Sequence, residues 1–135
     1  MEKILVIDDE EQILRLYSII LRKAGFEVVT ASGAKNGLAL AISAQPSLIL
    51  LDVMMPAVDG TEALANLAEN PATRHIPVIF LTSLIKENEV EEAQGDIGGH
   101  EFISKSTPND KVVARIKKAL SAARPPAPVA VTDQS

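Results

Sequence analysis

Three short runs of apolar residues, each followed at once by a polar residue, constrain the fold of this chain more than any other feature. The runs are Ile4–Ile7, Leu48–Leu51 and Val78–Leu81, and the residues that follow them are Asp8, Asp52 and Thr82. Four apolar residues without polar alternation are typical of strands that are buried on both faces. Strands of this kind occur in parallel sheets that are covered by helices.

Segments with helical character alternate with these runs. Apolar residues recur at helical spacing over 13–24, 34–42, 64–68 and 112–120, the acidic segment 86–94 is a further helix candidate, and weaker strands are expected at 27–30 and 102–104. A strand followed by a helix, repeated five times along the chain, predicts an α/β fold. We expect a five-stranded parallel sheet of flavodoxin-like (βα)5 topology, with strand order 2-1-3-4-5 and helices on both faces.

The chain of 135 residues has the length of one domain. From Ala122 onward, proline and alanine dominate the sequence, as they do in disordered or polyproline-II segments. We therefore expect a folded domain over residues 1–121 and a disordered tail over 122–135.

Charge and composition exclude several classes of protein. The net charge of −5 disfavours binding to a nucleic-acid backbone, and the absence of cysteine excludes disulfides and cysteine-based zinc sites. No apolar stretch approaches the ~18 residues of a membrane span. Only four apolar residues precede Asp8, whereas a secretory signal needs about 7 to 15, so we expect a cytoplasmic protein with no membrane insertion.

The polar residues at the predicted strand ends define a candidate site. They are Asp8, Asp9, Asp52, Thr82 and Lys105. Open α/β sheets bind ligands at the carboxyl ends of their strands, where the strand order reverses. If the order is 2-1-3-4-5, the first and third strands are neighbours, and three carboxylates share one pocket. Two unit charges ~4 Å apart repel by about 4 kcal/mol at an effective dielectric constant of ~20.

Either of two effects can offset this repulsion: a raised pKa of one carboxylate, or a bound divalent cation. Oxygen ligands without histidine or cysteine favour Mg²⁺, or Mn²⁺, over zinc and copper. Mg²⁺ commonly combines one or two carboxylates with waters and a substrate phosphate. The candidate site therefore suits a hard cation and a phosphoryl group.

Four motifs at these strand ends resemble the receiver domain of response regulators in two-component signalling. They are VIDDEE over Val6–Glu11, LLDVMMP over Leu50–Pro56 with Asp59-Gly60 after it, FLTS over Phe80–Ser83 and FISKS over Phe102–Ser106. Each motif is weak alone, but the four in this order and at these separations are highly specific. The resemblance covers roughly residues 3 to 121.

The resemblance implies a role for each residue of the candidate site. Asp52 is the implied phosphoacceptor, which takes the phosphoryl group from a phosphohistidine of a sensor histidine kinase or a phosphotransfer protein. The implied Mg²⁺ ligands are Asp8, Asp9, Asp52 and the backbone carbonyl of Met54. Lys105 and Thr82 would stabilise the phosphoryl group, and Thr82 with Phe102 would form the switch. A stand-alone receiver of this kind would act on an output protein or in a phosphorelay, and would not turn over a separate substrate.

Several residues depart from the pattern of the family. Phe102 lacks a hydroxyl group, so a switch at this position must work by packing alone. Ser106 stands where the family usually has a proline, and a cis peptide bond is costly before a residue other than proline, so we expect a trans bond and a differently aimed Lys105. Met54 and Leu84, at positions that tune the lifetime of the phosphoryl group, are apolar and cannot orient an attacking water. We therefore expect slow self-dephosphorylation.

One alternative from another class stays open: an interaction module that keeps the fold and works without phosphorylation. Ser106 and Phe102 are its only support. Enzyme alternatives are weaker. The acidic first loop would repel the phosphate of a flavin, the chain has no glycine-rich phosphate loop, and Asp52 lacks the second aspartate that a haloacid-dehalogenase-type phosphatase carries two residues later.

Overall fold

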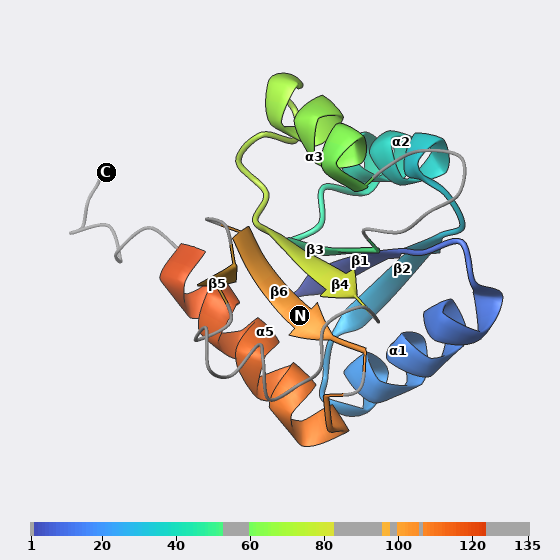
Figure 1. The fold of residues 1–135 in the computed structure, drawn as a ribbon, viewed down its shortest axis with the longest axis vertical. Coiled ribbons are helices and arrows are strands. Elements are labelled where there is room, and N and C mark those ends of the chain that lie inside the picture. The colour runs from blue at the N-terminus through green and yellow to red at the C-terminus, as the bar shows by residue number, and fades with distance from the viewer. Residues whose placement is uncertain (1, 53–59, 83–95, 98–99, 106, 124–135) are drawn as a thin grey trace.

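The computed structural model describes residues 2–52, 60–82, 96–97, 100–105 and 107–123, which form one sheet with helices on both faces (Figure 1). The strands are β1 (Lys3–Ile7), β2 (Glu27–Ala31), β3 (Leu48–Asp52), β4 (Val78–Thr82), β5 (Asp96–Ile97) and β6 (His100–Ser104). The described helices are α1 (Glu11–Lys23), α2 (Ala34–Ala44), α3 (Gly60–Glu69) and α5 (Asn109–Ala123). None of these helices is both long enough and apolar enough to cross a membrane.

The order of strands in the sheet is β2-β1-β3-β4-β6-β5. All strands except β5 pair in parallel, and β6 is the fifth strand of the prediction, so the expected order 2-1-3-4-5 is confirmed. The short strand β5 pairs with β6 in antiparallel fashion and was not predicted. Gly98-Gly99 lies between the two strands in the sequence, and two glycines in this position favour a hairpin.

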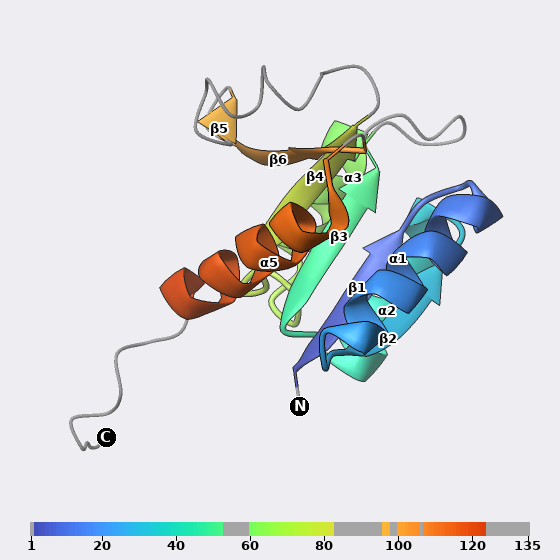
Figure 2. The ribbon, with the colours of Figure 1, turned by 90° about the horizontal axis from the view of Figure 1, so that it is seen from below.

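Two hydrophobic clusters cover the two faces of the sheet, because successive side chains of a strand point to opposite faces. Ile4, Val6, Leu48 and Leu50 belong to the cluster that packs against α1 and α5. These two helices lie over the same face of the sheet (Figure 2). The alternate residues, such as Leu5, Ile7, Ile49 and Leu51, belong to the cluster on the side of α2 and α3. The apolar runs are therefore buried on both faces, as predicted.

Helix α1 ends where the sequence indicates. Gly25, with φ +96°, follows the C-cap of α1, and the amides of Gly25 and Phe26 donate to the carbonyls of Arg22 and Leu21. These two bonds are the Schellman arrangement, which favours glycine in the left-handed region. The predicted helix at 86–94 lies outside the described residues. Helix α5 continues to Ala123, so the predicted boundary between domain and tail at 121/122 is two residues too early. Alanine is the best helix former, and the first proline of this segment comes only at Pro125. The rest of the predicted tail, 124–135, lies outside the described part of the chain.

Helix α2 lies close to the end of β1 at Gly37. A Cβ atom added to Gly37 would lie 2.8 Å from Cγ1 and 3.1 Å from Cγ2 of Ile7, closer than side-chain atoms normally approach. Ile7 is the last residue of β1 and directly precedes Asp8. The contact between Gly37 and Ile7 therefore helps to set where the carboxyl end of β1 lies.

Candidate functional site

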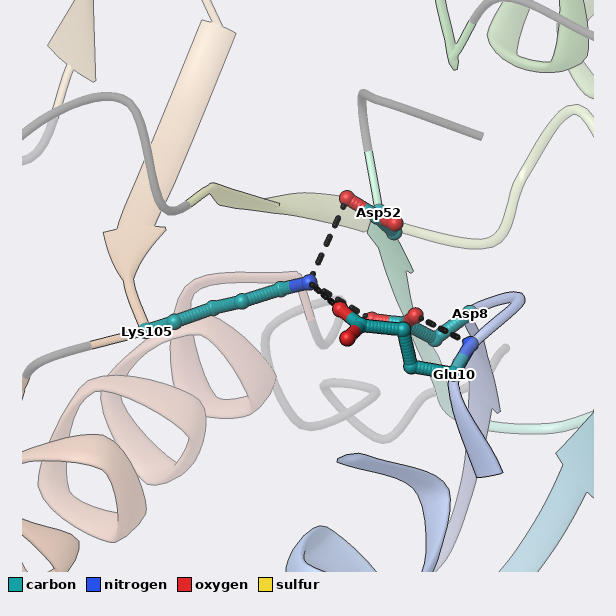
Figure 3. Close-up of polar contacts among 4 residues, drawn as sticks. All are labelled: Asp8, Glu10, Asp52 and Lys105. Atoms are coloured by element: carbon teal, nitrogen blue, oxygen red, sulfur yellow. Dashed lines mark hydrogen bonds and ion pairs between the residues drawn. The ribbon is translucent and has the colours of Figure 1, made fainter. Parts of the chain in front are cut away.

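Four of the predicted site residues lie where parallel strands end. Asp8 comes directly after β1, and Lys105 directly after β6. Asp52 and Thr82 are the last residues of β3 and β4. Since these strands are parallel, their ends lie along one edge of the sheet. The side chains of Asp8, Asp52 and Lys105 point toward one another there (Figure 3).

Asp8 is a fully buried carboxylate. Its Oδ1 accepts a hydrogen bond of 2.9 Å from the backbone amide of Glu10. Its Oδ2 lies 2.9 Å from Nζ of Lys105, yet accepts no well-directed hydrogen bond from any described residue, so the contact with Lys105 is chiefly ionic. Burial raises the pKa of Asp8 to about 6, although the amide of Glu10 and the ammonium of Lys105 both lower it. The fold therefore holds this carboxyl group where its charge is poorly compensated.

Lys105 extends its ammonium group into a set of three carboxylates. Nζ lies 2.9 Å from Oδ2 of Asp8, 3.5 Å from Oδ1 of Asp52 and 3.5 Å from Oε1 of Glu10 (Figure 3). Burial by itself lowers the pKa of Lys105, but the contacts with Asp8, Asp52 and Glu10 outweigh burial and raise it. The backbone amide of Lys105 donates to the carbonyl of Thr82 at 2.7 Å, which anchors the base of the side chain. The ammonium group therefore remains charged at neutral pH.

The three aspartates that the sequence singled out lie together, with one carboxylate oxygen of each within 4.8 Å of the others. Asp8 and Asp52 are buried, whereas Asp9 is exposed. All three donors are carboxylate oxygens, and Oδ2 of Asp8 accepts no hydrogen bond within the described structure. Oxygen donors of this kind suit Mg²⁺ or Mn²⁺, and the carboxylate of Asp9 is exposed to solvent. The residues present therefore fit a hard divalent cation.

Thr82 and Phe102 lie on the neighbouring strands β4 and β6. Thr82 is buried and stands opposite Ser104 in the parallel register. Phe102 is half-buried, and its ring packs on that of Phe80 with a centroid distance of 5.1 Å and an interplanar angle of 37°. Such a tilted pair is a favourable aromatic contact. Phe102 thus has a packing role in the described structure, and its part in a switch stays a prediction.

Sequence reasoning did not assign a role to Glu10, the third carboxylate beside Lys105. The signal was present, because Glu10 belongs to the acidic run Asp8–Glu11, but the run alone does not show that Glu10 faces the lysine. Met54, Leu84 and Ser106 lie outside the described residues. Their predicted roles in metal binding, phosphoryl lifetime and loop geometry therefore stay predictions.

Comparison with known proteins gives relatives over most of the chain. The DNA-binding dual master transcriptional regulator RpaA of Synechocystis is 38% identical over 121 residues, which are 89% of this chain and 49% of RpaA. Protein PilG of Pseudomonas aeruginosa is 34% identical over 116 residues, which are 85% of this chain and 84% of PilG. This chain thus spans half or less of several curated relatives, among them RpaA, and most of PilG.

Solved structures give the same result. The chemotaxis protein CheY4 of Vibrio cholerae superposes with a TM-score of 0.74 at 26% identity, over 87% of this chain and 98% of CheY4. A family model described as the response regulator receiver domain matches residues 4–117. That match includes the carboxyl ends of the strands that meet at the carboxylate site, and it ends within helix α5. The chain therefore belongs to the receiver domains of two-component response regulators.

Proposed function

We propose that this receiver domain is a phosphorylation-dependent signalling switch in which Asp52 accepts a phosphoryl group. The donor is a phosphohistidine of a sensor histidine kinase or a phosphotransfer protein, which implies a cytoplasmic location. One observation carries the proposal: Asp52 lies 3.5 Å from the ammonium of Lys105 and within 4.8 Å of the carboxylate oxygens of Asp8 and Asp9. This arrangement combines a nucleophile, a fixed positive charge and a set of cation ligands.

The resident cofactor of the proposed reaction is Mg²⁺, or Mn²⁺ in its place. Asp8, Asp9 and Asp52 would hold the ion, together with the backbone carbonyl of Met54, which lies outside the described residues. When bound, the cation supplies positive charge that offsets the carboxylates and the oxygens of the phosphoryl group.

The residues of the chain act on the phosphoryl group directly. A carboxylate oxygen of Asp52 forms the new P–O bond while the P–N bond to the donor histidine breaks, and the electron pair returns to the imidazole ring. The ammonium of Lys105 compensates the charge on a phosphoryl oxygen, and the hydroxyl of Thr82 can donate a hydrogen bond to another. Asp52 is buried, so little water competes with the donor at the reacting oxygen.

The phosphorylated state is read by protein partners. Thr82 ends β4 and Phe102 lies on the adjacent strand β6, so a shift of the Thr82 hydroxyl toward the phosphoryl group changes the space beside the aromatic pair. The altered surface then serves an output protein, or the phosphoryl group passes on in a relay. The domain catalyses its own phosphorylation and slow dephosphorylation and turns over no separate substrate.

Mass measurement with a small-molecule phosphodonor tests the proposal. Wild type incubated with the donor and Mg²⁺ is expected to gain the mass of one phosphoryl group, and Asp52→Asn is expected to gain none. Asp110→Asn removes an exposed carboxylate on α5 and serves as the matched control, which should label like wild type. Labelling that persists in Asp52→Asn, or that ignores a chelator, contradicts the proposal. Wild type that takes up no label with Mg²⁺ present supports the phosphorylation-independent module instead.

The lifetime of the label tests the roles of the lifetime-tuning positions. Because Met54 cannot orient an attacking water, we expect Met54→Asn to shorten the half-life of the phosphoryl group by about tenfold. The measurement is the decay of the phosphorylated mass after the donor is removed. A half-life that stays the same or lengthens in the variant argues against water delivery as the limiting step.

A further inference from the structure

The contacts around Asp8 give its two oxygens different surroundings. Oδ1 is already fixed by the backbone amide of Glu10 at 2.9 Å. Oδ2 accepts no hydrogen bond from the described residues and faces Nζ of Lys105 at 2.9 Å. Oδ2 is therefore the oxygen of Asp8 that is better placed for a divalent cation, and in this structure the ammonium of Lys105 lies against it. A cation at Asp8 and the ammonium of Lys105 compete for the same atom.

Glu10 also contacts the ammonium group of Lys105. Its Oε1 is 3.5 Å from Nζ of Lys105, and its side chain is 60% exposed (Figure 3). Glu10 is not among the carboxylates whose oxygens converge on the cation site. It can therefore approach the ammonium group without giving up a cation ligand, and an exposed side chain can adjust its rotamer at little cost.

We infer that Glu10 is a positioning residue that takes over the ammonium group of Lys105 when a divalent cation binds Asp8. This inference rests on the proposed function of the same site. The backbone of Lys105 stays anchored to Thr82, so only the end of the side chain has to move. Glu10 then keeps the ammonium group beside Asp52, where an incoming phosphoryl oxygen meets it. Without Glu10, repulsion by the cation would drive the ammonium group toward solvent.

Calorimetric titration with Mg²⁺ tests the inference without any phosphorylation. Glu10→Gln is expected to weaken Mg²⁺ binding by about threefold to fivefold, the range of an exposed ion pair. Glu11→Gln removes an equal charge from the next exposed residue and should weaken binding less than about twofold. In the Lys105→Met background, Glu10→Gln should weaken Mg²⁺ binding no more than Glu11→Gln does, because the partner of Glu10 is gone.

The inference is overturned if Glu10→Gln weakens Mg²⁺ binding equally with and without Lys105, or if Glu10→Gln binds Mg²⁺ more tightly than wild type does. Either result leaves the proposed function intact. Wild type that binds no Mg²⁺ contradicts the proposed function as well. If Lys105→Met does not fold, the NMR signals of the Lys105 Cε group decide: at saturating Mg²⁺ they should shift to the values of a solvated lysine in Glu10→Gln and not in Glu11→Gln. Identical signals in both variants overturn the inference.

Discussion

Strand β3 contains both of the environments that differ most in this molecule. Leu48–Leu51 are fully buried among other apolar side chains on both faces of the sheet. The next residue, Asp52, is 3% exposed and carries a carboxylate beside a second buried carboxylate, that of Asp8. The apolar run stabilises the fold by removing its side chains from water. The carboxyl edge carries charges that are buried at a cost, and this cost leaves the edge ready to receive a cation.

The largest change in the free energy of unfolding is expected in the interior of the sheet. Leu50→Ala leaves a cavity at a residue that is fully buried, and we expect the free energy of unfolding to fall by about 2 to 5 kcal/mol. The matched control is Leu16→Ala on α1, since Leu16 is 46% exposed and should change the free energy by less than about 0.5 kcal/mol. Chemical denaturation measures both values. Similar losses in the two variants would mean that burial does not set the contribution of these leucines.

At the carboxyl edge of the sheet, we expect a substitution that raises the free energy of unfolding instead of lowering it. The pKa of Asp8 is raised from 3.8 to about 6 in the folded protein, so between these values the folded state binds more protons than the unfolded state. As the pH rises from 3.8 to about 6, ionisation of Asp8 therefore lowers the free energy of unfolding of the metal-free protein. Asp8→Asn removes this loss and should raise the free energy of unfolding at pH 7 by on the order of 1 to 3 kcal/mol.

Denaturation of the metal-free protein at several pH values measures this effect. Asp9→Asn is the control, because Asp9 is exposed and its loss relieves no buried charge. The gain of Asp8→Asn over wild type should vanish below pH 3.8, where the carboxyl group is protonated in both states. Mg²⁺ should stabilise wild type and not Asp8→Asn, since a ligand that binds only the folded state raises its stability. A variant that is less stable than wild type at pH 7 would show that the ion pair with Lys105 outweighs burial.

A smaller change in the free energy of unfolding is expected where the apolar interior meets the carboxyl edge of the sheet, at Gly37 and Ile7. Gly37→Ala gains helix propensity of about 1 kcal/mol but crowds the side chain of Ile7, which costs about 1 to 3 kcal/mol, so we expect a net loss of about 1 kcal/mol. Ile7→Val removes the end of the crowded side chain. The loss in the double variant should therefore be smaller than the sum of the two single losses. Strict additivity would contradict the contact between α2 and β1.

Much of this fold could be predicted because its signals are local. The apolar runs at Ile4–Ile7 and Leu48–Leu51 have no polar alternation, and Gly25 marks a helix end that needs a left-handed residue. The strand β5 could not be predicted with the same ease. It has two residues, Asp96 and Ile97, and among the described strands it pairs with β6, so hydrophobic periodicity carries no trace of it.

In the candidate site, too, some features could be predicted from the sequence and one could not. The positions of Asp8, Asp52 and Lys105 follow from the rule that ligands bind at the carboxyl ends of parallel strands. Two ways of relieving their repulsion were open from the sequence, and both involve the same residue: burial raises the pKa of Asp8, and its carboxylate lies together with those of Asp9 and Asp52, which could hold a cation. The contact of Glu10 with Lys105 depends on the path of one side chain, which no sequence pattern encodes.

The central claim is that a carboxylate at the end of β3 becomes phosphorylated. Reduction of the labelled protein with borohydride converts an aspartyl phosphate to homoserine, and mass spectrometry of the resulting peptides locates it. We predict homoserine at position 52 alone, and only in samples that were labelled in the presence of Mg²⁺. Homoserine at Asp8 or Asp9, or none at position 52 in protein that carries the label, would contradict the account.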